Sequence, residues 1–173
     1  GADDDEVTNS GDLTATATGE AASAAVSFTA AGVAVSGGSV WDGGTRSVTR
    51  ASGIGLGAGA DELVNEGELT ADSTARAPGI SVSVAVEGVA GAITAATADA
   101  GATGIDAGAG DDDVRSTRQI TSDARANANT VSAAGTKFGV SVAGNGTWEG
   151  GTSGTAAASG INAGSTTHTL RHS

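Results

Sequence analysis

Residues 51–63 read ASGIGLGAGADEL, and both ends of this stretch recur elsewhere in the chain. The opening Ala-Ser-Gly-Ile returns in related form at residues 102–105 and again at 158–161. The closing pair of acidic residues followed by an aliphatic residue returns at 112–114 and also stands near the start, at 5–7. Because independent landmarks recur at matching offsets, the sequence indicates a tandem repeat.

The repeat unit runs from Val7 to Leu63, from there to Val114, and then to Leu170, so the middle unit is shorter than the other two. These offsets predict repeats at 1–56, 57–107 and 108–163 within one domain, 1–173. Residues 164–173 are then the start of a fourth repeat or a C-terminal tail.

The segments inside each repeat alternate with a period of two residues, which is the pattern of β-strands. The alternation is clear at residues 13–18, 80–86 and 138–142. With 29 Gly, two Phe, two Trp and no Tyr, the chain has few large side chains to fill a globular core, whereas stacked strands enclose only a thin interior. The pattern predicts an all-β parallel β-helix, or β-solenoid, and an antiparallel β-sandwich is the alternative.

A finer period inside the middle repeat is also visible. Residues 69–80 resemble residues 93–105, which follow them by about half a repeat. Two coils per repeat, and about six in all, would follow from this half-period. One very wide coil per repeat is the other interpretation.

The net charge of −12 argues against nucleic acid as a partner, because nucleic acid favours a basic face. No apolar run approaches the roughly 20 residues of a membrane-spanning helix, so membrane insertion is not expected. The chain has no Cys, which excludes disulfides and thiolate metal sites.

Acidic residues gather at the corners of the predicted repeats, where stacking would bring like charges together. Hard carboxylate ligands favour Ca²⁺ over transition metals, so Ca²⁺ is the expected ion. The interpretation that competes with cation binding is that these residues only solubilise turns. The candidate metal ligands are Asp3, Asp4, Asp5, Asp61, Glu62, Asp111, Asp112 and Asp113.

Residues 108–114 and 57–63 resemble the Gly-x-Gly-x-Asp-x-aliphatic core of RTX calcium-binding repeats. This resemblance implies that Asp61 and Asp112, and Asp5 by position, are the calcium ligands. RTX motifs run in tandem, however, whereas this chain has one motif per repeat.

The wider pattern resembles the β-solenoid passengers of autotransporters and other secreted bacterial surface adhesins. The residues that carry it are Asn9, Gly11 and Leu13, with Asn65, Gly67 and Leu69 in the second repeat. The resemblance implies a secreted or cell-surface protein.

Trp41 and Trp148 occupy one repeat position, and each is followed by an acid and two glycines. They are candidate contacts to a neighbouring subunit or a ligand, with burial in a corner as the alternative. The two histidines, His168 and His172, are expected in a flexible tail.

The expected function is that of an extracellular structural protein, in which solenoid subunits assemble end to end into a filament or form an adhesin stalk, with Ca²⁺ as a stabilising ion. The alternative is an adhesin module that recognises glycan or ice on one face. We expect no enzymatic activity, because the acidic residues belong to repeat corners rather than to one catalytic constellation.

Overall fold

The computed structural model describes residues 1–37, 44–145, 151–164 and 168–172. Every regular element among them is a β-strand, so the predicted all-β class is confirmed. No helix in this part of the chain has the length and hydrophobicity to span a membrane. The strands are β1 (Glu6–Asn9), β2 (Leu13–Glu20), β3 (Ser23–Gly37), β4 (Thr45–Gly55), β5 (Glu62–Asn65), β6 (Leu69–Ile93), β7 (Ala96–Asp106), β8 (Asp113–Ser116), β9 (Ile120–Gly144), β10 (Ser153–Asn162) and β11 (Thr169–His172).

All strand pairs are parallel, and each joins residues that are one repeat apart. Val7 lies beside Leu63, Leu63 beside Val114, and Val114 beside Leu170. We call the three repeats, 1–56, 57–107 and 108–163, levels 1, 2 and 3. Level 2 is in the middle, and Gly164 with β11 begins a fourth level.

The strands form three sheets, each crossing the levels. The end sheet has the order β1-β5-β8-β11, and the return sheet has the order β10-β7-β4. In the long sheet, β6 pairs with β2 and β3 on one side and with β9 on the other.

Two of the sequence-based alternatives are wrong. An antiparallel β-sandwich is contradicted by the parallel pairing. Coils of half a repeat are contradicted by the register, because residues at that separation do not pair in the described sheets. The two resembling segments lie in facing layers that run in opposite directions, so the Ser81 hydroxyl donates a hydrogen bond of 3.3 Å to the Ile93 carbonyl oxygen, and Thr49 shares one of 2.8 Å with Ser73. The half-period therefore reflects two similar strands of one wide level and not two stacked coils.

The difference in length between the repeats lies at one place. In level 2 the chain passes from Ile93 to Ala96 almost directly. The partners of these two residues in level 1 are Gly37 and Thr45, which are further apart along the chain. Part of this longer connection, residues 38–43, is outside the described residues, as is 146–150 in level 3.

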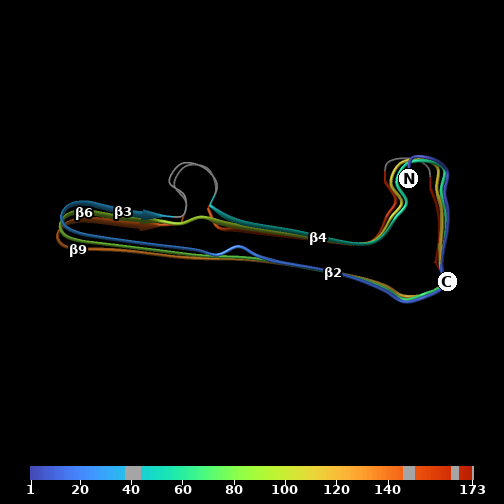
Figure 1. Cartoon of the computed structure of the whole chain (residues 1–173), viewed down its shortest axis with the longest axis horizontal. Helices are drawn as coiled ribbons and strands as arrows, with labels where there is room; N and C mark the ends of the chain where they lie inside the picture. The colour runs from blue at the N-terminus through green and yellow to red at the C-terminus, as the bar shows by residue number, and fades with distance from the viewer. Residues whose placement is uncertain (38–43, 146–150, 165–167, 173) are drawn as a thin grey trace.

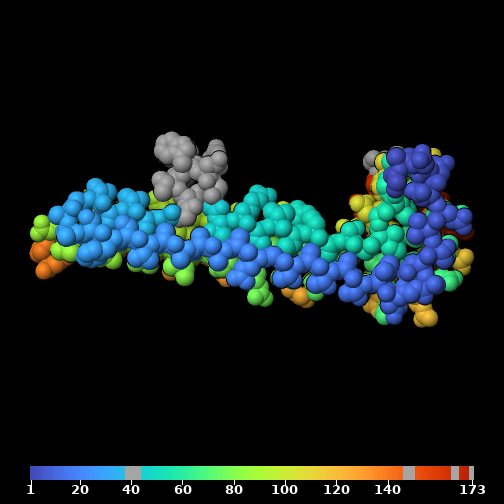
Figure 2. Space-filling model, in the orientation of Figure 1, coloured from blue at the N-terminus to red at the C-terminus, as the bar shows by residue number. Residues whose placement is uncertain are grey.

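Each level is a long, flat loop, and the three loops superimpose in projection (Figure 1). The long sheet runs away from the end sheet, turns at its far end, and returns toward β4 (Figure 1). Gly32, Gly88 and Gly139 stack at this turn with positive φ values of 111°, 121° and 142°. A Cβ at Gly88 would lie 1.9 Å from the Gly32 carbonyl oxygen, so only glycine fits here. The space-filling view shows how narrow the resulting body is (Figure 2).

The interior changes in character along the loop. Near the end sheet it is aliphatic, with Leu63, Leu69, Ile105 and Val114 fully buried. Between β6 and β7 the buried hydrophobic cluster consists of alanines: Ala75, Ala77, Ala96, Ala98 and Ala100. Small side chains let the two layers approach closely, so alanines from both strands fill the space between the layers.

Around the turn at Gly88, the larger side chains face outward and the smaller ones inward. Ser81, Ser83 and Ala85 are buried, while Ile80 and Val84 are 49% and 39% exposed. The Ser83 hydroxyl donates a hydrogen bond of 2.8 Å to the Ala34 carbonyl oxygen across the interior. Hydrophobicity alone would therefore assign the wrong face of this strand to the core.

We expect Ala98→Leu to lower the free energy of unfolding by about 1–3 kcal/mol. The added carbons would have to separate two closely spaced backbones. Ala24→Leu is the matched control, since Ala24 is exposed on the outward face of β3. Urea unfolding followed by circular dichroism measures both. Equal unfolding midpoints for the two variants would contradict the thin alanine interior.

Candidate functional site

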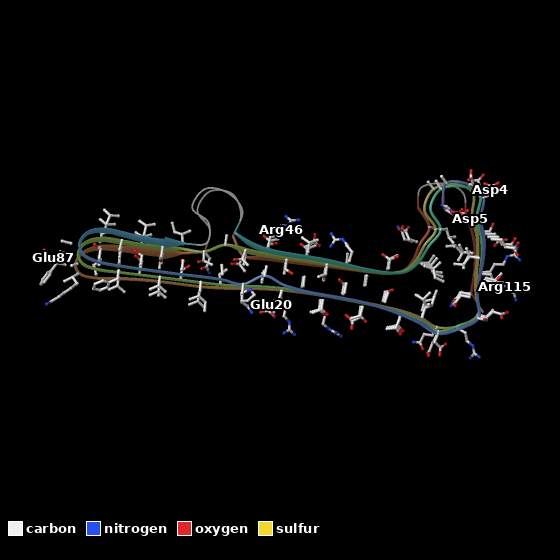
Figure 3. All side chains as sticks on the ribbon, viewed as in Figure 1. Asp4, Asp5, Glu20, Arg46, Glu87 and Arg115 are labelled. Atoms are coloured by element: carbon white, nitrogen blue, oxygen red, sulfur yellow. The ribbon has the colours of Figure 1, made fainter. Side chains whose placement is uncertain are left out.

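The acidic residues picked out by sequence lie together at one end of the loop, around the end sheet and the turns that lead into it (Figure 3). The turns place some carboxylates in the interior and others on the surface. The structure thus separates the eight candidate metal ligands into two rows and a few isolated side chains.

The first row leads into the interior and consists of Asp5, Asp61, Asp112 and His168, which occupy one repeat position on successive levels. The backbone N–H of Asp5 donates to Oδ1 of Asp61 at 2.8 Å, and the N–H of Asp61 donates to Oδ1 of Asp112 at 2.9 Å. Nδ1 of His168 lies 3.1 Å from Oδ2 of Asp112. The carboxylates of Asp61 and Asp112 therefore each satisfy a backbone donor of the preceding level, and a histidine ends the row.

Burying the carboxylates of this row costs free energy of folding. Asp61 and Asp112 are each only 2% exposed, and they lie on adjacent levels about 4.8 Å apart. Oδ2 of Asp61 has no hydrogen-bond partner among the described residues. Two buried like charges at this separation repel each other, and backbone N–H groups compensate only part of that cost.

The second row lies on the outer face of the end sheet and contains Glu6, Glu62 and Asp113. In the parallel register, Glu6 pairs with Glu62 and Glu62 pairs with Asp113. All three side chains are exposed, so water and dissolved ions screen their repulsion. Glu6 belongs to this row although the sequence analysis did not select it.

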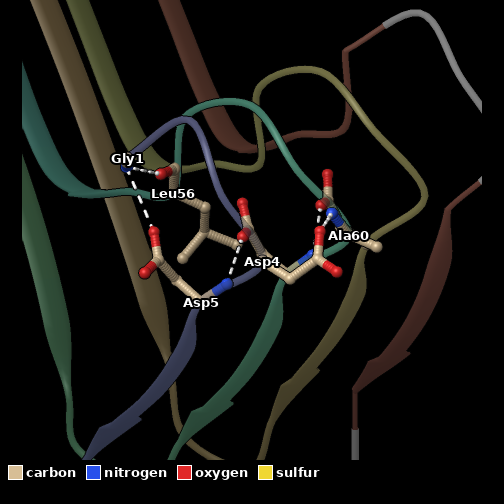
Figure 4. Close-up of polar contacts among 7 residues, drawn as sticks. Gly1, Asp4, Asp5, Leu56 and Ala60 are labelled. Atoms are coloured by element: carbon tan, nitrogen blue, oxygen red, sulfur yellow. Dashed lines mark hydrogen bonds and ion pairs between the residues drawn. The ribbon is translucent and has the colours of Figure 1, made fainter.

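The remaining candidates do not join either row. Asp3 and Asp111 are exposed in turns. Asp4 accepts a hydrogen bond of 2.8 Å from the backbone N–H of Ala60, as the close-up shows (Figure 4). In the same view, the amino group of Gly1 donates to the Leu56 carbonyl oxygen at 2.6 Å and lies 3.3 Å from Oδ2 of Asp5.

The geometry does not form a closed calcium site. Among the described residues, no three acidic or histidine side chains converge in a way that could hold a metal ion. Oxygens that the RTX resemblance assigns to calcium accept backbone hydrogen bonds here. Calcium binding at the acidic end therefore stays a prediction, and the carboxylates have a visible role without it.

A buried amide row runs beside the aspartates, at the corner between the end sheet and the long sheet. Nδ2 of Asn9 donates to Oδ1 of Asn65 at 2.7 Å, and Nδ2 of Asn65 donates to the Ser116 hydroxyl at 3.0 Å. The same Nδ2 also donates to the Gly67 carbonyl oxygen at 2.9 Å. Asn65 is fully buried, so these bonds fix both the turn and the stacking of levels.

Another candidate surface is apolar and lies around the turn at Gly88. Its most exposed members are Val26 at 78%, Phe28 at 70%, Val33 at 69% and Phe138 at 62%. They continue across the levels with their register partners, so that Val33, Val89 and Val140 form one row. Trp41 and Trp148, the predicted contact residues, lie outside the described residues.

Sequence reasoning missed two features of the acidic end. His168 was expected in a flexible tail, but its side chain is 4% exposed and lies against Asp112. The signal was present, because His168 follows Asp112 at the same offset at which Leu170 follows Val114. The role of Asn65 was also missed, although its recurrence at Asn9 was noted.

Comparison with known protein families, curated proteins and solved structures finds no match for this chain.

We expect Asp61→Asn to raise stability by about 1 kcal/mol in the presence of a chelator. Asparagine keeps the Oδ1 acceptor for the Asp5 N–H but removes one of the buried charges. Asp61→Ala should lose about 1–3 kcal/mol, because that N–H then has no acceptor. Thermal unfolding measures both, and a loss with Asp61→Asn as large as with Asp61→Ala would show that the charge itself is needed.

We expect CaCl₂ at millimolar concentration to raise the Tm more than NaCl of equal ionic strength does, because divalent cations relieve repulsion in the carboxylate rows more effectively. The double variant Glu62→Gln/Asp113→Asn should reduce this difference by shortening the outer row. Identical Tm values in the two salts would contradict cation binding at the acidic end.

Proposed function

We propose that this chain is an extracellular structural module, a segment of β-solenoid whose levels extend by stacking into a filament or an adhesin stalk. The observation that carries the proposal is the in-register parallel pairing of equal repeat positions from level to level. Between β6 and β9 this register holds from Leu69 beside Ile120 to Ile93 beside Gly144.

Both ends of the stack support the same proposal. In the part of the chain that the structure describes, β2, β3 and β4 have neighbours on one side only, and so do β9 and β10. Their outer edges present backbone N–H and C=O groups without strand partners. Soluble proteins usually protect such edges, because they are templates for further strand pairing.

The extracellular location rests on the resemblance to adhesin passengers and remains part of the proposal. The same applies to the absence of enzymatic activity. What favours a structural role is that the polar groups of the acidic end are repeated on each level and bond mainly to backbone groups of the neighbouring level.

The alternative, a module that recognises glycan or ice, is supported less well. Thr14, Thr70 and Thr121 do form one outward row. The next outward row contains Thr16, Asp72 and Asp123, so the regular threonine array that an ice-binding face requires is interrupted.

We expect the purified chain to form ribbons without any added ligand. Each copy contributes three levels, so the axial repeat should be about 14 Å, with a reflection at about 4.8 Å along the ribbon axis. Negative-stain microscopy and fibre diffraction measure these spacings, and sedimentation velocity measures the dependence on concentration. Monomers at all concentrations, both in CaCl₂ and in chelator, would contradict self-assembly and favour the binding module.

A further inference from the structure

Strands β1 and β11 occupy the same repeat position at opposite ends of the end sheet. β1 pairs with β5 through Glu6 and Glu62, and β11 pairs with β8 through Thr169 and Asp113. Gly164 precedes β11 with a φ of +70° and stacks on Gly108. Gly164 and residues 168–172 therefore occupy the repeat positions of the segment that opens level 1.

The open edge of level 3 matches the open edge of level 1. If a second copy continued the register, Ile120 would lie beside Leu13, Val140 beside Val33 and Ile161 beside Ile54 of that copy. These are the combinations of side chains that already stack between levels inside one chain.

Charge does not oppose this contact. In the continued register, Asp123 and Arg125 lie beside Thr16 and Thr18 of the second copy, and Asn127 lies beside Glu20. The return sheet places Ser153 beside Arg46 of the second copy. No pair of like charges arises between the described strands of the long and return sheets, whereas the existing contact between levels 2 and 3 includes Asp72 beside Asp123.

One clash remains, and it lies in the end sheet. The position beside β8 that β1 of a second copy would take is already occupied by β11. Of the two strands, β11 suits this position better. It brings His168 next to Asp112, whereas β1 would bring Asp5 and add a third buried carboxylate to the row.

We propose that the open edge of level 3 binds the level 1 edge of a second copy, and that residues 1–10 of this incoming copy withdraw so that β11 of the first copy replaces its β1. The proposal rests on the proposed function, because it specifies how copies join. The partner copy contributes a strand to the joint, since the second copy receives its first end-sheet strand from the first.

Cysteine crosslinking tests the contact, because the chain contains no Cys of its own. Thr16→Cys and Asp123→Cys lie two levels apart within one copy, about 9.6 Å, which is beyond disulfide reach. Across the proposed joint they are neighbours, about 4.8 Å apart. We expect oxidation of this double variant to give a ladder of covalent multimers on a non-reducing gel.

The matched control is Thr16→Cys with Val142→Cys, because in the proposed register Val142 lies beside Val35 of the second copy, beyond the turn. This control should give no ladder. Thr16→Cys alone should also give no dimers. A disulfide between two copies of this variant would require their level 1 edges to meet, and the proposed joint contains no such contact. Absence of the ladder in the first variant would overturn the joint and the proposed self-assembly together.

A second pair of variants tests the exchange itself. Thr8→Cys/Val64→Cys pins β1 to β5, and Arg115→Cys/Arg171→Cys pins β11 to β8, in each case through outward positions in register. After intramolecular oxidation at low concentration, we expect the β1-pinned protein to need at least about tenfold higher concentration to assemble in sedimentation experiments. Reduction should restore assembly, and the β11-pinned protein should assemble like its reduced form.

The outcomes separate the exchange from the proposed function. If β1-pinned protein assembles as readily as its reduced form, the exchange is overturned while the stacking stands. If the β11-pinned protein is the one that is blocked, the direction of exchange is overturned.

Discussion

Backbone hydrogen bonding between residues one repeat apart is the constraint on which the rest of this structure depends. Parallel pairing at this offset places each side chain on top of its own counterpart in the next level. A position is stable only if its residue tolerates a similar neighbour at about 4.8 Å. Alanine, valine and asparagine meet that condition, because they gain packing or amide hydrogen bonds from stacking. Carboxylates do not, and the carboxylates of the buried aspartate row accept hydrogen bonds from backbone N–H groups of the neighbouring level, which offset part of their repulsion.

The same constraint decides which parts of the fold the sequence could predict. The repeat offsets and the strand periodicity follow from side chains along the chain, so the all-β class and the recurrence of equivalent positions could be predicted. The number of residues in one level could not be predicted, because two arrangements explain the likeness of residues 69–80 to residues 93–105. Stacked coils and facing layers both require small residues at alternate positions. Only the register separates them, and it places Thr49 and Ser73 across the interior rather than side by side.

The candidate site was predictable in position but not in geometry. Asp61 and Asp112 were identified by their motif, and they do lie in one row. Whether a carboxylate faces inward or outward depends on strand parity after a glycine turn, which sequence patterns leave open. That parity puts Asp61 in the interior and its neighbour Glu62 on the surface. The position of His168 was not predicted because the equivalent residue on the other levels is an aspartate, so no histidine pattern marks it.

A stack of this kind has no intrinsic length, because the bonds that join level 2 to level 3 are the same bonds that level 3 could make to another level. What limits growth must therefore lie in the few places where the levels differ. The long and return sheets differ little at their edges, and the described residues of β9 and β10 include neither a buried charge nor a proline that would prevent further pairing. The end sheet is different, since β11 already covers β8 and replaces the aspartate with histidine. If copies stack as proposed, control over growth would lie in the end sheet, whose strands are the shortest of the fold and have the fewest backbone hydrogen bonds to break.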